Sequence, residues 1–260
     1  MAERLLNFGL DMQVHQQPMG FSYGEEVIGP VPEIRKLDQI RASLRDPLCQ
    51  GPEDVYAIVM DVARLQDREE LKKRMLLFGV VTYASGRLGD EPIRSQGHIH
   101  RISAHSGWSP PELYEIWQGK AIIYMQEYVA DDPGRCFAIV AGSGEKVLVP
   151  PGWAHATISA SPDEPLTFGA WCDREYGFEY EAVRAYKGLA WYPLLQDEHI
   201  AWQHNRRYMP GRLQVTSPRS YTEFGITDEP LYQQFIDDPA RFQFISKPGM
   251  VSQKWVGFHP

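Results

Sequence analysis

The chain has 260 residues, 43% of them apolar, and a formal net charge of −8 at pH 7. Its length and apolar content allow one substantial core with additions at both ends. The acidic charge disfavours nucleic acid and membranes as partners, although a phosphorylated small molecule can still bind at a local site.

Residues 1–54 are predicted to form an N-terminal extension that contains one helix. Residues 1–30 have a mixed composition with no clear period. A helical pattern begins at Pro32 and ends at Asp46-Pro47. Its apolar residues recur at spacings of three and four, as expected for one face of a helix: Ile34, Leu37, Ile40 and Leu44.

Residues 55–190 are predicted to form a β-barrel. Two β-rich runs, VYAIVMDV and LLFGVVTYA, are joined by a charged stretch over residues 64–75 that forms either a hairpin tip or a short helix. Beyond Gly86 come many short runs separated by Gly, Pro and Asp, a pattern typical of an antiparallel sandwich or barrel. Strands and helices do not alternate, which argues against a parallel doubly wound sheet.

Residues 191–260 are predicted to form a C-terminal extension that packs on the barrel. The segment is irregular and aromatic, and a last helix is expected from Thr227 to Asp238-Pro239, with Pro230 in its first turn. The chain has no internal repeat or flexible linker, so one domain with two extensions is the simplest organisation.

The cysteines and the N-terminus predict a soluble cytoplasmic protein. Cys49, Cys136 and Cys172 are odd in number and never form a CxxC pair, which is typical of reduced thiols. The N-terminus lacks a basic start followed by an apolar run, so we expect no signal peptide. No stretch approaches the ~18 apolar residues of a membrane span.

Four side chains predict a divalent-metal site. His98 and His100 lie in QGHIHR, and residues i and i+2 of a strand point to the same face. Glu112 opens the strand-like run ELYEIWQGK, and His155 follows a Pro-Pro-Gly turn in VPPGWAHATIS. Three imidazoles and a carboxylate suit Fe(II), Mn(II), Ni(II) or Zn(II), and an octahedral ion would keep two positions open for a bidentate oxygen ligand.

The HxH pair alone is weak evidence, because two histidines on a strand are often a surface pair or a satisfied core feature. The ordered set is more specific: a GHxH, a glutamate opening a strand that ends in a Gly turn, and a PPxWxH entering another strand. We therefore expect one divalent ion per chain, with Fe(II) favoured over Zn, Mn or Ni.

The run GHIH…ELYEIWQGKAIIYMQ…VLVPPGWAHATIS resembles the cupin superfamily, and most closely the cupin-type phosphoglucose isomerases first associated with archaea. The resemblance extends from about Val80 to about Gly188 and leaves both ends uncovered. It implies an all-β, double-stranded β-helix jelly-roll barrel with helical N- and C-terminal extensions. It also implies a homodimeric, metal-dependent aldose–ketose isomerase of glycolysis and gluconeogenesis, with glucose 6-phosphate and fructose 6-phosphate as substrates.

The resemblance also implies a role for individual residues. Ser95 stands where the family has a Thr near the substrate phosphate, and Thr82 matches another phosphate-contacting Thr. Glu112 and Tyr114 are the implied catalytic residues. The other implied roles are substrate binding for Gly97 and Tyr180, and metal ligation for His98, His100, Glu112 and His155.

The chain departs from the family pattern on the substrate side of the site. The loop between His100 and Glu112 is longer and carries an extra His105, for which a solvated loop position is expected. The remaining departures are Cys172 in place of a Tyr, Phe178 in place of a His, and Ser159 in place of an Asn. These differences bear on sugar and phosphate recognition more than on the metal ligands.

The expected chemistry is proton transfer between C2 and C1 of an open-chain sugar through a cis-enediol(ate), with Glu112 as the base. A hydride shift is the competing mechanism and needs no such base. Two other functions remain open: an Fe(II)-dependent cupin dioxygenase, and a non-catalytic sugar-binding cupin. The E-x-Y and GFEY segments favour the isomerase.

Overall fold

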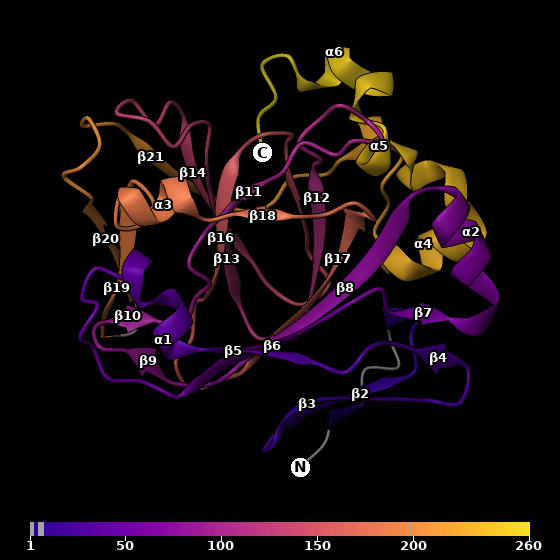
Figure 1. Cartoon of the computed structure of the whole chain (residues 1–260), viewed down its shortest axis with the longest axis horizontal. Helices are drawn as coiled ribbons and strands as arrows, with labels where there is room; N and C mark the ends of the chain where they lie inside the picture. The colour runs from indigo at the N-terminus through magenta and orange to yellow at the C-terminus, as the bar shows by residue number, and fades with distance from the viewer. Residues whose placement is uncertain (1–2, 5–7, 198) are drawn as a thin grey trace.

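Two facing β-sheets form a barrel in the computed structural model, which describes residues 3–4, 8–197 and 199–260 (Figure 1). One sheet has six strands in the order β15-β12-β17-β8-β6-β5, and the other has four in the order β16-β13-β14-β21. Neighbouring strands are antiparallel except β14 and β21. This arrangement confirms the predicted all-β jelly-roll barrel of the cupin type.

The ten barrel strands come from residues 33–216. In chain order they are β5 (Glu33–Lys36), β6 (Asp54–Met60), β8 (Leu76–Tyr83), β12 (Glu112–Gln118), β13 (Ala121–Gln126), β14 (Cys136–Ala141), β15 (Lys146–Val149), β16 (Ala154–Ser159), β17 (Leu166–Asp173) and β21 (Leu213–Thr216). Because β5 and β21 lie in the two predicted extensions, both extensions contribute a strand to the barrel sheets.

Short strands and helices surround the barrel. The remaining strands are β1 (Glu3–Arg4), β2 (Met12–Gln16), β3 (Met19–Tyr23), β4 (Val27–Ile28), β7 (Ala63–Arg64), β9 (Arg87–Leu88), β10 (Glu91–Pro92), β11 (Ile99–His100), β18 (Phe178–Glu179), β19 (Trp191–Gln196) and β20 (His199–His204). The α-helices are α1 (Leu37–Ile40), α2 (Arg68–Lys73), α3 (Glu181–Ala185), α4 (Leu231–Asp237), α5 (Gln243–Ser246) and α6 (Ser252–Trp255). Among the described residues, no helix has the length and apolarity needed to cross a membrane.

Three hydrophobic clusters explain why the strands are so apolar. One fills the barrel interior, with Val81 and Phe168 from one sheet packing with Ile123 and Phe137 of the other. The second lies between the outer face of the six-stranded sheet and the C-terminal helices, and the third covers the outer face of the four-stranded sheet. Because both faces are covered, every residue of β8 is buried, which accounts for the unbroken apolar run LLFGVVTY.

The predicted N-terminal helix is only partly correct. Glu33–Lys36 is the edge strand β5, and helical structure begins at Leu37 with the four-residue helix α1. Pairing of β5 with β6 satisfies backbone groups along the sheet edge, and this tertiary contact overrides the helical spacing of the apolar residues. The charged stretch after β7 contains a short helix, α2, which was one of the two expected alternatives.

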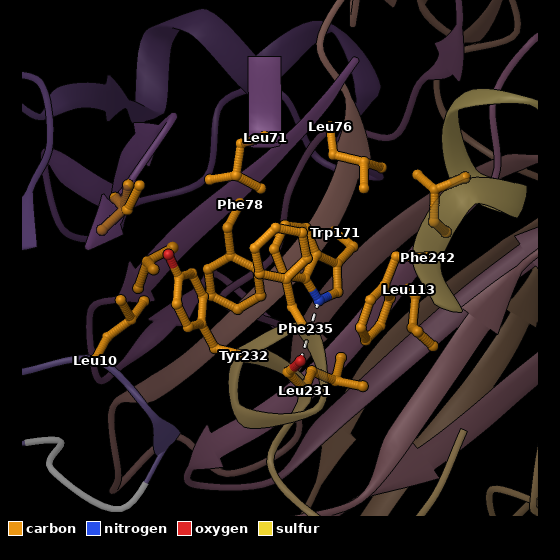
Figure 2. Close-up of a cluster of buried hydrophobic side chains, with 14 of the residues drawn as sticks. Leu10, Leu71, Leu76, Phe78, Leu113, Trp171, Leu231, Tyr232, Phe235 and Phe242 are labelled. Carbon is orange, nitrogen blue, oxygen red and sulfur yellow. Dashed lines mark hydrogen bonds between the residues drawn. The ribbon is translucent and has the colours of Figure 1, made fainter. Parts of the chain in front are cut away.

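The predicted C-terminal helix is present as α4 and begins four residues later than expected. Pro230 lies at its N-cap, and Asp238 is its C-cap. Pro230 has an extended backbone (ψ 137°), so the helix begins only after it. Figure 2 shows how α4 carries Tyr232 and Phe235 against Trp171 of β17.

Trp171 anchors the C-terminal helices to the barrel. Its ring is fully buried, stacks on Tyr232 at 5.7 Å between centroids, and lies 4.9 Å from Phe235 and 5.0 Å from Phe242. We expect Trp171→Ala to lower the free energy of unfolding by about 3–5 kcal/mol. The substitution leaves a cavity between the sheet and the helices that the surrounding residues cannot fill by small movements.

Urea unfolding would measure this loss, with Trp171→Phe as the comparison because it keeps one aromatic ring in place. If the free energy of unfolding of Trp171→Ala lies within about 1 kcal/mol of that of the wild type, the packing of Trp171 against the helices contributes little to stability.

Candidate metal centre

The backbone brings His98 and His155 side by side. The segment that precedes β11 runs antiparallel to β16, with Ser95 N donating to Thr157 O at 2.9 Å. His98 N donates to His155 O at 3.0 Å, and His155 N donates to His98 O at 2.9 Å. Paired residues of an antiparallel ladder carry their side chains on the same face, so the two imidazoles meet above this bridge.

Two further residues complete a cluster of four. His100 lies at the end of β11, which pairs with β18 in a separate two-stranded sheet, and Glu112 opens β12 in the six-stranded sheet, across from β16. One ligand atom from each of His98, His100, Glu112 and His155 lies within 4.8 Å of the others. The structure thus brings together the four side chains that the sequence predicts as ligands.

The hydrogen bonds of two histidines leave their Nε2 atoms directed at the centre of the cluster. His100 Nδ1 lies 2.9 Å from the carbonyl oxygen of Pro110, and His155 Nδ1 lies 3.1 Å from that of Trp153. A carbonyl can only accept, so each Nδ1 carries a hydrogen, and each Nε2 faces Glu112, where it donates to the carboxylate when protonated and can bind a cation once deprotonated. Burial, with His155 and His100 nearby, holds the pKa of His98 well below its ordinary value, so this imidazole is neutral.

Glu112 lies at the centre of the polar contacts. Its Oε2 is 3.1 Å from His155 Nε2 and 3.3 Å from His100 Nε2, and it accepts a hydrogen bond of 2.7 Å from the Tyr114 hydroxyl. Its Oε1 accepts a bond of 3.3 Å from Cys172 Sγ. Burial raises the pKa of Glu112, but the imidazoles of His100 and His155 outweigh burial and hold that pKa well below its ordinary value.

Two neighbours of Glu112 stay protonated. Burial, reinforced by the Glu112 carboxylate, raises the pKa of the Tyr114 hydroxyl and of the Cys172 thiol well above their ordinary values. Both groups therefore act as donors that orient the carboxylate. Cys172, which replaces a family Tyr, thus contacts the glutamate directly.

A cavity of about 600 Å³, including open solvent at its mouth, adjoins the cluster. His98, Glu112 and Tyr114 line it, together with three of the residues expected to bind substrate: Ser95, Gly97 and Tyr180. Gly97 has a φ of +86°, and a Cβ there would lie 2.9 Å from the Leu189 side chain, which explains why this position is glycine. Phe178 forms an apolar wall, with its ring 4.4 Å from that of His98.

Thr82 lies apart from this cavity, which corrects the sequence-based assignment. Its side chain is fully buried and contacts Gln16 Nε2 and Thr167 Oγ1, each at 2.9 Å. Its strand neighbours Val81 and Tyr83 line the cavity instead. Since side chains alternate across a strand, a register shifted by one residue selects the wrong face.

Sequence reasoning missed several residues that line the cavity. The alternation of β8 could have identified Tyr83, and the same argument applied to β6 could have identified Tyr56. Gln96, next to the predicted Ser95, is buried, and its Nε2 has no hydrogen-bond partner among the described residues. Arg35 comes from β5, for which the sequence predicted a helix. His105 is exposed, as expected for a solvated loop histidine.

The jelly-roll barrel and its cluster of three histidines and one glutamate define a cupin with a candidate metal site. A family model described as "Glucose-6-phosphate isomerase (GPI)" matches residues 41–211, which is more than half of the chain. The chain belongs to this family, as the sequence motifs indicate.

Relatives in this family carry the same description. The chain is 25% identical over 201 residues to a glucose-6-phosphate isomerase of Thermococcus kodakarensis. This alignment covers 75% of this chain and 98% of the relative. It is 30% identical over 137 residues to that of Thermococcus litoralis, covering 53% and 62%. A solved recombinant oxalate oxidase in complex with glycolate aligns with a TM-score of 0.37 and 14% identity, over 53% of this chain and 60% of that one.

Proposed function

We propose that this chain interconverts glucose 6-phosphate and fructose 6-phosphate at a divalent-metal site held by His98, His100, Glu112 and His155. The observation that carries the proposal is the convergence of these four ligand atoms within 4.8 Å beside a cavity, in a member of the glucose-6-phosphate isomerase family. The relatives' name supports the substrate pair.

The residues fit a bound cation. His98 Nε2 and His100 Nε2 are buried without a hydrogen-bond partner among the described residues, which is costly unless something else binds them. Ligand atoms that share one ion at about 2.1 Å lie at most about 4.2 Å apart, so a cluster spread over 4.8 Å needs to contract only slightly. When bound, the ion supplies Lewis-acid polarisation of the substrate carbonyl and stabilises negative charge on its oxygen.

Glu112 is the proposed base that moves a proton between C2 and C1 of the open-chain sugar. Its carboxylate is ionised, faces the cavity, and is held by donors from Tyr114 and Cys172. A carboxylate fixed in this way can take a carbon-bound proton and return it to the neighbouring carbon without reorganising.

The other cavity residues are proposed to orient the sugar. Ser95, Gly97 and Tyr180 line the cavity, and Phe178 excludes water from one side of the His98 ring. Exclusion of water strengthens every electrostatic interaction inside the site and prevents loss of the enediol(ate) proton to solvent.

Metal removal and restoration test the proposal. We expect chelation to abolish the interconversion of fructose 6-phosphate and glucose 6-phosphate, and anaerobic addition of Fe(II), Mn(II) or Zn(II) to restore it. Full activity after chelation, with no metal left by elemental analysis, contradicts the metal proposal. Oxygen uptake with a sugar substrate, without isomerisation, would favour a dioxygenase. Native mass spectrometry would count the ions and test the proposed homodimer.

A further inference from the structure

The metal centre forms one part of the cavity, and a single cationic side chain lies in another part. Of the described residues that line the cavity, Arg35 is the one lysine or arginine. It comes from the edge strand β5, where it pairs with Tyr56 of β6, and β5 lies outside the span 41–211 that matches the family. The family resemblance therefore assigns no role to this arginine.

Arg35 is held inside the cavity with donors to spare. Its side chain is 15% exposed, and its Nε is buried without a hydrogen-bond partner among the described residues. One of its terminal nitrogens lies 2.7 Å from Glu33 Oε1, whose side chain is 63% exposed. A guanidinium has five N–H donors and stays charged, so its contacts with the solvated Glu33 carboxylate and the Tyr56 hydroxyl leave donors free for a further ligand.

Tyrosines connect Arg35 to the rest of the site. The hydroxyls of Tyr56 and Tyr180 lie close enough to act on its charge. The Tyr56 ring is 4.9 Å from that of Tyr83, whose hydroxyl reaches Ser95, and the Tyr180 ring is 6.1 Å from that of His98. The cavity therefore carries the metal-site side chains and, out of contact with them, one cation, with tyrosines lining the wall.

We propose that Arg35 binds the phosphate of the substrate and so determines specificity for phosphorylated over neutral sugars. The inference rests on the proposed isomerase function. A sugar phosphate carries vicinal oxygens at one end and a dianion at the other, which matches the metal-site side chains and the separate cation of this cavity. Arginine binds phosphate through paired, charge-assisted hydrogen bonds, and a mostly buried, poorly hydrated arginine gains from such a ligand.

The main test is Arg35→Met, which keeps the bulk of the side chain and removes its charge. Loss of one charged hydrogen-bonding partner predicts a rise of about 10- to 100-fold in KM for fructose 6-phosphate and in the inhibition constant of inorganic phosphate. The metal content is expected to stay the same, because Arg35 contacts none of the metal-site side chains. Arg35→Lys is expected to recover part of the loss, since a point charge remains.

Two variants serve as controls. Arg101→Met removes one positive charge at an exposed arginine paired with Glu179 and is expected to leave both constants within about twofold. Glu33→Gln keeps Arg35 and removes the carboxylate that forms an ion pair with it. This variant is expected to bind phosphate more tightly, because the carboxylate no longer competes for the guanidinium. This variant also covers the case in which Arg35→Met does not fold.

The outcomes separate the two proposals. If the wild type binds phosphate but isomerises no sugar phosphate, the proposed function fails, and calorimetry with inorganic phosphate still tests Arg35. The role of Arg35 is overturned if phosphate binding changes less than twofold in Arg35→Met. It is also overturned if the wild type binds neither phosphate nor fructose 6-phosphate. Equal losses in Arg35→Met and Arg101→Met would also overturn it, because they would indicate a general charge effect.

Discussion

Replacing His155 by alanine is expected to remove most of the bound metal and most of the activity. His155 is 1% exposed, its Nδ1 is committed to the Trp153 carbonyl, and its Nε2 faces Glu112. Loss of a residue that merely orients a ligand weakens metal binding about 10- to 100-fold, so loss of a ligand should cost at least about 100-fold. Elemental analysis of the purified variant and steady-state isomerase kinetics would measure both effects.

The matched control is His105→Ala, which removes an exposed histidine from the loop between two of the ligands. It is expected to keep wild-type metal content and activity, so that general effects of losing an imidazole are separated from loss of a ligand. A His155→Ala protein that retains stoichiometric metal would show that the cation lies elsewhere. The proposed site would then have to be abandoned.

Glu112→Gln is expected to damage turnover far more than substrate binding. The amide keeps the size of the side chain and one oxygen that can contact a metal, but it cannot accept a carbon-bound proton. Removal of a general base lowers rates by about 10²- to 10⁴-fold, so we expect kcat to fall in this range and KM to change by less than about tenfold. The comparison requires variant and wild type with the same measured metal content, because Glu112 is also a proposed ligand.

The same variant discriminates between the two mechanisms. A hydride shift between C2 and C1 needs no base at this position. A metal-loaded Glu112→Gln enzyme that keeps kcat within about fivefold of wild type would contradict the role of base and favour the hydride shift. An effect confined to KM would assign Glu112 to substrate binding alone.

The barrel was predictable because its signals are local. Short apolar runs between Gly, Pro and Asp turns predict antiparallel strands, and the structure has them in two facing sheets. The helix expected from Pro32 is the exception. Residues 33–36 form an edge strand because β6 offers unpaired backbone groups, and no local pattern encodes that contact. The same misassignment hid Arg35 from the candidate site.

The types and order of the metal-site residues could be predicted from the sequence, because each motif combines a ligand residue with the strand or turn that positions it. His98 and His100 are two residues apart, so an extended chain points both to one face, and His155 follows a Pro-Pro-Gly turn. Which other side chains reach the same space depends on strand register and on the packing of distant segments. Thr82 points away from the cavity while Tyr83 lines it, because a single residue step reverses the face of a strand. Cys172 reaches Glu112 and Arg35 enters the cavity only once the sheets have paired, since these contacts join residues far apart along the chain.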